Sequence, residues 1–430
     1  MDIHWGIRRR LIAAVTTVLL QTALLSTGLL SITANAAEIA TATPESVGMS
    51  SERLLRIHTV MQRHIDAGNI QGAVTVVARR GKVVHFETHG LMDVEKKQPM
   101  AKDAIFRMAS STKPILAVAT MMLIEEGLIR PTDEISKYIP EFKDMQVAVL
   151  KDPADEDISP FFVRRDNVPE HRLVPAERPI TIHHLLTHTS GLASSGLGTI
   201  ATGRLPRGPD ATLASHIPNY GAVPLDFQPG TRWAYSPGVG LNVVARIVEI
   251  VSNTPFDVFI RERIFEPLGM KDTHFNVPPE KASRRVVIQG RDFSGRGPTK
   301  YFSASGGLSS TAGDYLRLEQ MFVNGGTLFG NRLLSPRSVE MMASNQIGDL
   351  YRGFSRTQEG MGYGYTVAVV LDPIASNSRR SKGAFGWGGA FGTQSWTDPR
   401  EELTAVIMLQ QPFGRAQYDF GNAVRQAIID

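Results

Sequence analysis

The 430-residue chain contains no cysteine. This absence excludes a disulfide framework, a thiolate metal site, a cysteine nucleophile and a lipid anchor on an N-terminal cysteine. Excess charge is also scarce, because the formal net charge is only +4 and three arginines lie within the first ten residues. A nucleic-acid-binding protein is expected to carry a basic patch or stripe, and no segment of this chain resembles one. We therefore expect no nucleic-acid partner.

The N-terminal segment has the pattern of an export signal. Arginines at 8–10 precede an apolar run over about 11–32, and a small-x-small sequence follows at 34–36. This pattern predicts a signal peptide over residues 1–36, cleaved after Ala36, and a periplasmic or secreted protein without stable membrane insertion. The apolar run exceeds the roughly 7–15 residues usual for a signal, so an uncleaved anchor stays open. The arginines also leave open whether export follows the general or the twin-arginine route.

The remaining residues, 37–430, predict strands at both ends of the chain and helices between them. Residues 51–67 carry apolar side chains at helical spacing after a serine cap, and two β-branched runs then meet at Arg80-Gly81, which is typical of a hairpin. Strand-like runs return after residue 360 and precede a last helix. We therefore predict an α/β (α+β) fold in which the termini build one antiparallel sheet. The sheet lobe would span about 37–115 and 290–430, and a mostly helical lobe, about 116–290, would be inserted.

The stretch FRMASSTKPI, residues 106–115, places Ser110 three residues before Lys113. Pro114 is tolerated only in the first turn of a helix, so a helix must begin near Ser110. Residues i and i+3 share a helix face, which lets Ser110 and Lys113 touch, whereas Ser111 is badly placed. Burial would favour a neutral lysine that takes the serine proton. The alternative is that Ser110 only caps the helix while Lys113 faces water.

Three further stretches give this pair its context: LLTHTSGL at 185–192, PGTRWAYSPGVGLNVVARIVE at 229–249 and GAFGWGGAFGTQSWTDP at 383–399. Their order and spacing resemble the serine β-lactamase and penicillin-binding-protein superfamily, nearest to its class C-like branch and the family VIII carboxylesterases. The resemblance implies a β-lactamase/transpeptidase-like fold, an antiparallel sheet flanked by helices, and a serine acyl-enzyme without a metal or other cofactor.

The resemblance also implies roles for individual residues. Ser110 would be the nucleophile, Lys113 its activating partner, and Tyr235 of YSP the second acid/base group. The backbone N–H groups of Ser110 and Ala390 would form the oxyanion hole. Fixed N–H donors of this kind stabilise a tetrahedral oxyanion.

Two departures from the family pattern concern the substrate. Pro237 stands where relatives carry the asparagine of Tyr-x-Asn, and Trp387-Gly388-Gly389 stands in place of Lys-Thr-Gly. The side chains that would bind an amide and a carboxylate of the substrate are therefore absent, and apolar side chains replace them. We therefore expect residues 237 and 387–389 to bind substrate, and we expect a carboxylesterase that cleaves small-molecule esters.

Other functions stay open. A DD-peptidase, a β-lactamase or a D-amino-acid amidase or peptidase would act on an amide, and a non-catalytic binding protein could share the fold. His184 and His188, four residues apart, have the spacing of a zinc pair, but no nearby carboxylate completes a ligand set. Thr311 or Ser310 is expected to cap a helix that opens near Asp314.

Overall fold

The computed structural model describes residues 38–152, 168–203, 205–288, 297–351, 353 and 359–430. Residues 39–430 form one compact unit. The predicted signal peptide, residues 1–36, lies outside the described residues. Within the described part, no helix has both the length and the apolar character needed to cross a membrane.

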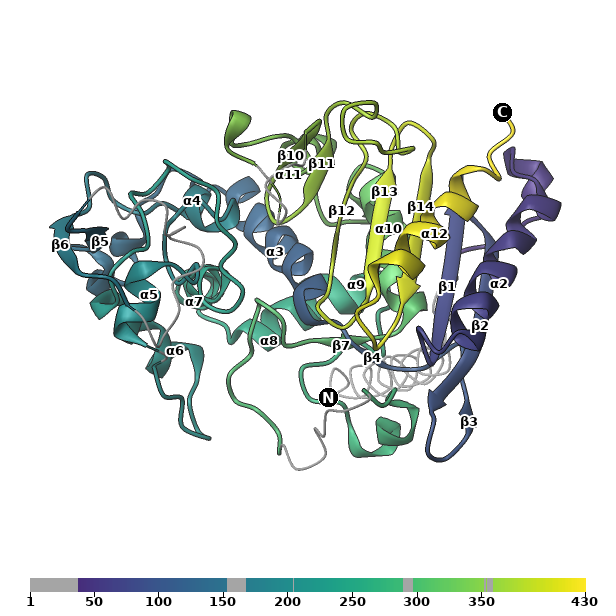
Figure 1. The fold of residues 1–430 in the computed structure, drawn as a ribbon, viewed down its shortest axis with the longest axis horizontal. Coiled ribbons are helices and arrows are strands. Elements are labelled where there is room, and N and C mark those ends of the chain that lie inside the picture. Colours follow the sequence, from purple (N-terminus) through teal and green to yellow (C-terminus); the bar gives the residue numbers. More distant parts are fainter. Residues whose placement is uncertain (1–37, 153–167, 204, 289–296, 352, 354–358) are drawn as a thin grey trace, which may run out of the picture. The chain divides into compact units, whose positions relative to one another are not determined.

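Within the described residues, eight antiparallel strands form the main sheet, and they come from both ends of the chain, as predicted (Figure 1). In spatial order they are β10 (Met361–Tyr363), β11 (Ala368–Val370), β12 (Phe385–Gly388), β13 (Gln394–Asp398), β14 (Leu403–Met408), β1 (Gly72–Arg79), β2 (Lys82–Asp93) and β3 (Gln98–Pro99). The first and last parts of the chain meet where β1 pairs with β14, with Val76 opposite Val406.

Local sequence signals explain the N-terminal elements. Helix α2 (Ser51–Asp66) begins after Ser50, whose hydroxyl accepts a hydrogen bond from the Arg53 N–H at 3.2 Å. The hairpin between β1 and β2 turns at Arg80 and Gly81, which both adopt positive φ angles. Two central residues with positive φ match the right-handed twist of paired strands. The predicted cap and hairpin are therefore confirmed.

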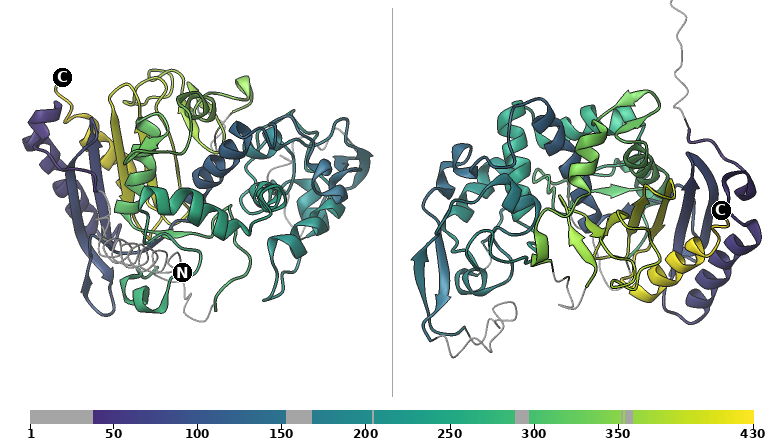
Figure 2. Two further views of the ribbon diagram at one scale, coloured as in Figure 1. Left: turned by 180° about the vertical axis from the view of Figure 1, so that it is seen from behind. Right: turned by 90° about the horizontal axis from the view of Figure 1, so that it is seen from above.

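Helices cover both faces of the sheet (Figure 2). Ala73 and Val77 of β1 pack on one face beneath α2 and α12 (Gly414–Arg425), while Val74 and Val76 point to the opposite face, which α10 (Ala312–Val323) covers. This alternation follows from the two-residue period of a strand. Thr311 caps α10 through a 3.1 Å hydrogen bond from the Asp314 N–H, so of the two expected caps the threonine is confirmed.

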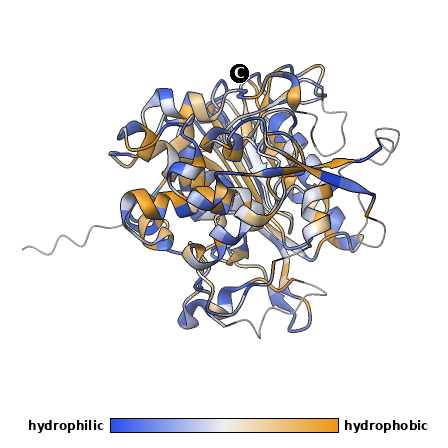
Figure 3. Ribbon diagram, turned by 90° about the vertical axis from the view of Figure 1, so that its left-hand side faces the viewer, coloured by the Kyte–Doolittle hydropathy of each residue, from blue (hydrophilic) through white to orange (hydrophobic). Residues whose placement is uncertain are grey.

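The regular elements in the described middle of the chain are mainly helices, and they carry both hydrophobic and hydrophilic residues (Figure 3). Helix α3 (Lys113–Glu125) is buried along eleven of its residues, which suits its almost uniformly apolar sequence. In the described residues, the strands and α-helices that follow α3 as far as α9 are β5 (Gln146–Leu150), β6 (His171–Pro175), α4 (Ile182–Leu186), α5 (Leu197–Thr202), α6 (Leu213–His216), α7 (Gly240–Ser252), α8 (Phe256–Ile260) and α9 (Glu266–Leu268).

Short elements complete the fold. They are β4 (Phe106–Arg107), which pairs with β7 (Ser309–Ser310), β8 (Thr327–Leu328), which pairs with β9 (Asn331–Arg332), and α11 (Pro336–Met342). The β4–β7 pair joins the strand that leads into Ser110 to the strand that leads into α10.

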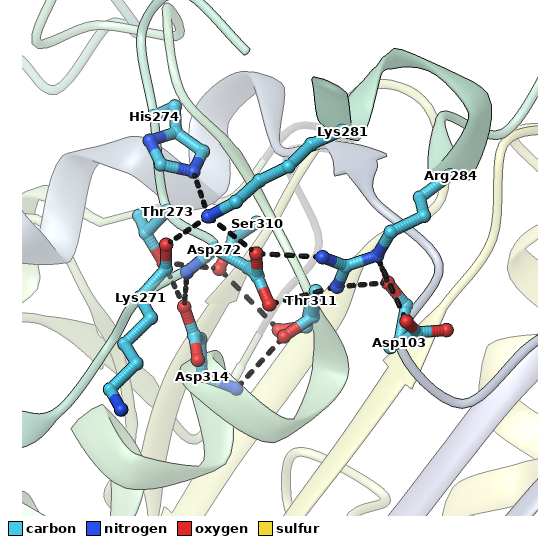
Figure 4. Close-up of polar contacts among 10 residues, drawn as sticks. All are labelled: Asp103, Lys271, Asp272, Thr273, His274, Lys281, Arg284, Ser310, Thr311 and Asp314. Carbon is cyan, nitrogen blue, oxygen red and sulfur yellow. Dashed lines mark hydrogen bonds and ion pairs between the residues drawn. The ribbon is translucent and has the colours of Figure 1, made fainter. Parts of the chain in front are cut away.

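A polar network fastens the segment after α9 to the start of α10 (Figure 4). Asp272 forms ion pairs with Arg284 at 2.8 Å and Lys281 at 2.9 Å. The Asp314 carboxylate of α10 accepts hydrogen bonds from the Asp272 N–H at 2.7 Å and the Thr273 hydroxyl at 2.9 Å. Hydrogen bonds with charged partners are stronger than neutral ones, so this network fixes the position of α10 beneath the sheet.

Candidate active site

Ser110 lies in a short 3₁₀ turn, Ala109–Thr112, between β4 and α3. Pro114 lies in the first turn of α3, where its missing N–H is tolerated, as the sequence predicted. The N-cap residue of α3 is Thr112 rather than Ser110. Ala109 has a φ of +46°, an uncommon value for a residue with a side chain. The alternative in which Ser110 serves only as the helix cap is therefore not supported.

Lys113 is fully buried beside Ser110. Its Nζ atom donates to Ser110 Oγ at 3.2 Å, to the Pro237 carbonyl at 3.4 Å and to the Ser305 carbonyl. Burial lowers the pKa of Lys113 to about 7, because the charged amine loses its hydration. In a large fraction of the molecules, Lys113 is therefore neutral near pH 7 and able to accept a proton.

Tyr235 completes a three-residue cluster with Ser110 and Lys113. Its hydroxyl donates to Ser110 Oγ at 2.7 Å, and the Lys113 amine lies 4.9 Å from the centre of the tyrosine ring. Burial raises the pKa of Tyr235 to about 12, although hydrogen bonds with Ser110 and Trp387 oppose the shift. The phenol is therefore protonated near neutral pH and presents its proton to Ser110.

The turn after β12 lies directly against the turn that carries Ser110. The Thr393 hydroxyl donates to the Met108 carbonyl at 3.1 Å and lies 2.9 Å from the Ser111 hydroxyl. A Cβ atom on Gly389 would lie 2.1 Å from the Met108 oxygen, so only glycine fits at that position. Ser111 is buried in this contact.

Trp387 and Gly388 belong to β12, an internal strand of the main sheet. Strand β12 lies inside the sheet, between β11 and β13, because the chain supplies two more strands beyond it. However, β11 pairs with β12 only as far as Gly386, whereas Trp387 and Gly388 pair with β13 alone. One side of β12 is therefore open at Trp387 and Gly388, although the strand as a whole is internal.

A cavity of about 570 Å³ opens beside Ser110. Its size lies within the range typical of small-molecule sites. Tyr235, Tyr351 and Trp387 are the aromatic residues of its wall, and the rings of Tyr235 and Trp387 lie 5.7 Å apart. The buried Tyr363 ring packs behind this wall, 5.3 Å from the Trp387 ring. The residues lining the cavity include Ser110, Tyr235, Tyr351, Met361, Val370, Arg380, Trp387, Gly388, Gly389 and Ala390.

The structure thus brings together all but one of the residues predicted to form the site. Pro237 is the exception: its carbonyl contacts Lys113, but its exposed side chain is not among the residues that line the cavity. The two histidines weighed as a zinc pair have separate contacts. His184 Nδ1 accepts a hydrogen bond from the Thr181 N–H at 3.2 Å, and His188 Nδ1 accepts one from the Ser236 N–H at 3.3 Å.

Three residues around the Ser110 site were not predicted from the sequence to contribute to it. The buried His188 ring packs edge-on against the Tyr235 ring, with the two ring centres 4.6 Å apart, and restricts its position. Asn242 of α7 accepts a hydrogen bond from the Ser305 N–H at 3.1 Å and so holds the carbonyl that binds Lys113. Arg380 also lines the cavity, with its guanidinium 4.4 Å from the Trp396 ring centre. The THTSG stretch was a visible signal for His188, but the other two contacts join segments far apart in sequence.

Comparison with known proteins agrees with the family resemblance of the sequence motifs. The family model described as Beta-lactamase matches residues 57–428. Protein Rv1367c of Mycobacterium tuberculosis is 36% identical over 369 residues, which cover 80% of this chain and 87% of the relative. Esterase EstB of Burkholderia gladioli is 28% identical over 409 residues, which cover 87% of this chain and 94% of the esterase.

Among solved structures, simvastatin synthase (LovD) from Aspergillus terreus, unliganded and in selenomethionyl form, superimposes with a TM-score of 0.70 at 21% identity. The match covers 87% of this chain and 98% of the synthase. The likeness confirms the β-lactamase/transpeptidase-like fold predicted from the four sequence motifs.

The contact between Gly389 and the Ser110 turn generates a test. Gly389→Ala should lower kcat/KM at least tenfold on any substrate that the protein turns over, because the new Cβ must push the turn away from Met108. Gly313→Ala is the matched control, since a Cβ at that position in α10 meets atoms only at 4.0 Å. Steady-state kinetics of the two folded variants measure the difference. Activity of Gly389→Ala within twofold of the wild type would contradict the close contact.

Proposed function

From the premise that this chain belongs to the beta-lactamase family and is a serine hydrolase, we propose that it is an exported carboxylesterase acting through Ser110. The observation that carries this proposal is the convergence of Lys113 and Tyr235 on the Ser110 hydroxyl, at 3.2 Å and 2.7 Å, beside an aromatic-walled cavity. The N-terminal sequence pattern supports export. The name of the relative EstB supports an ester substrate.

Acylation begins with proton transfer from Ser110. Neutral Lys113 accepts the hydroxyl proton while Oγ attacks the ester carbonyl carbon, and the carbonyl oxygen becomes an oxyanion. The backbone N–H groups of Ser110 and Ala390, which both line the cavity, stabilise this charge. The carbon–oxygen bond to the alcohol then breaks, and the departing oxygen receives a proton through Tyr235, whose hydroxyl is replenished from Lys113.

Deacylation repeats these steps with water as the nucleophile. The water gives its proton to the same pair of groups and attacks the acyl carbon, and Ser110 leaves with a proton restored to Oγ. The two pKa values divide the roles: with values of about 7 and about 12, Lys113 is the base near neutral pH and Tyr235 relays a proton without holding a charge.

The cavity supports a neutral, apolar substrate. Trp387 and Tyr351 present ring surface to it, and Trp387 occupies the place where penicillin-recognising relatives carry a cationic side chain. Apolar acyl or alcohol groups gain from burial against such rings in proportion to the area removed from water. An ester with a short or medium chain fits both the chemistry of the walls and the volume of about 570 Å³.

One observation favours a second candidate, an amidase, peptidase or lactamase that binds a carboxylate. The guanidinium-bearing residue Arg380 lines the same cavity. An arginine can bind a carboxylate through two parallel hydrogen bonds. Arg380→Gln separates the two functions, because it should reduce turnover of anionic amides selectively if Arg380 binds a carboxylate and should leave neutral esters nearly unaffected.

The pH profile tests the assignment of the base. The kcat/KM for a neutral ester should fall as pH drops through about 7, because protonated Lys113 cannot accept the Ser110 proton. Lys113→Ala and Tyr235→Phe should each lower the rate by about 10²–10⁴-fold with the fold intact. An acid limb near the ordinary pKa of a carboxylate, about 4, would exclude Lys113 as the base.

A substrate panel tests the esterase assignment. Short- and medium-chain p-nitrophenyl esters should show higher kcat/KM than nitrocefin or a D-Ala-D-Ala peptide, since each missing charge-assisted hydrogen bond costs about 1.5–3 kcal/mol. Trp387→Lys should shift the ratio toward the anionic substrates. Ser110→Ala supplies the background rate. Higher kcat/KM on nitrocefin or the peptide than on every ester would overturn the esterase proposal and leave the serine mechanism standing.

A further inference from the structure

A cluster of histidine and glutamate side chains, which can bind metal ions, lies on β2 and α2. None of these residues lines the Ser110 cavity. Strand β2 contains the sequence His85-Phe86-Glu87-Thr88-His89, and successive residues of a strand point to opposite faces. His85, Glu87 and His89 therefore share the face on which α2 packs (Figure 1). His58 projects from α2 toward them, with its Nδ1 3.5 Å from Glu87 Oε2.

His58, Glu87 and His89 form a three-ligand set. One ligand atom from each lies within 4.8 Å of the other two. Ligand atoms around a tetrahedral zinc ion, with bonds of about 2.0–2.2 Å, lie about 3.4 Å apart. The exposed His58 side chain can close the remaining gap by rotating about its own bonds, because its relative exposure is 59%. The arrangement thus needs only a side-chain adjustment to hold an ion.

The buried histidine supplies an independent indication. His89 is only 3% exposed, and its solvent-shielded Nδ1 has no hydrogen-bond partner among the described residues. An unsatisfied buried polar atom normally costs free energy, so its persistence calls for an explanation. A neutral imidazole carries a lone pair on one ring nitrogen, and that nitrogen is the atom that a metal ion takes as a ligand.

Neighbouring hydrogen bonds orient the ring for this purpose. The Thr75 hydroxyl lies 2.9 Å from His89 Nε2 and 2.8 Å from His85 Nε2. A hydroxyl has one proton, so Thr75 can accept from His89 Nε2–H while it donates to His85 Nε2. His89 Nδ1 then carries its lone pair, and His85 turns an Nδ1–H toward Glu87 Oε1, 4.0 Å away. Such partners behind a ligand fix its tautomer and orientation.

We propose that His58, Glu87 and His89 bind a divalent transition-metal ion, for which Zn²⁺ is the suited probe. Two imidazoles and one carboxylate favour zinc and its neighbours over Mg²⁺ and Ca²⁺, which prefer oxygen ligands alone. Three protein ligands leave a fourth position for water. The ion ties the exposed face of α2 to β2 and so stabilises the N-terminal part of the sheet.

Calorimetric titration of the chelator-treated protein with ZnCl₂ tests the proposal. We expect one saturable Zn²⁺ site per chain, a rise in Tm with Zn²⁺, and no comparable response to Ca²⁺, since an ion that binds only the native state stabilises it. Co²⁺ should give a visible absorption band from bound imidazole and carboxylate ligands. Absence of saturable Zn²⁺ binding, or equal binding of Ca²⁺, would overturn the proposal.

Variants locate the site. His58→Ala and Glu87→Gln alter side chains that are partly exposed and should fold, yet each should weaken Zn²⁺ binding at least tenfold and abolish the Co²⁺ band. His171→Ala, a histidine on β6, is the matched control and should bind as the wild type does. All three variants should keep wild-type ester turnover. If His58→Ala and Glu87→Gln bind Zn²⁺ with unchanged affinity, the ion lies elsewhere and the proposal is wrong.

Discussion

The burial of one amine, Lys113 Nζ, is the constraint on which the site depends. Removing a charged ammonium from water is unfavourable, and the protein resolves this by lowering the pKa to about 7 rather than by supplying a carboxylate among the amine's hydrogen-bond partners. The amine binds two backbone carbonyls and a serine hydroxyl instead. A paired carboxylate would have favoured the charged form and left no base beside Ser110.

Several elements are arranged around that amine. Helix α3 places it inside the molecule because nearly all of its first three turns are apolar. Asn242 holds the Ser305 carbonyl that it binds, and His188 packs behind the Tyr235 ring that covers it. The Gly389 turn reaches Met108 so closely that a methyl group would collide with the backbone. The sheet therefore contributes the residues from Trp387 to Ala390 to the cavity, and the helical segment contributes Lys113 and Tyr235 beside Ser110.

Much of the fold could be predicted from sequence because its signals are local. The Ser50 cap, the Arg80-Gly81 turn and Pro114 each act within a few residues of the element that they delimit. The position of β12 inside the sheet could not be predicted, since it depends on β10 and β11 adding to the sheet beyond it. The open half of β12 arises because β11 pairs with only half of its length. The alternating His-x-Glu-x-His pattern of β2 was visible in the sequence, but its partner His58 is identified only once α2 packs on the sheet.

The most direct test of the account is to find which side chain becomes covalently attached. After reaction with a fluorophosphonate, peptide mass spectrometry should locate a single adduct on Ser110. Ser110→Ala should lose the adduct, and Ser111→Ala should keep it, because Ser111 is buried against Thr393. An adduct on Ser111, or labelling that survives in Ser110→Ala, would contradict the claim that Lys113 and Tyr235 activate Ser110.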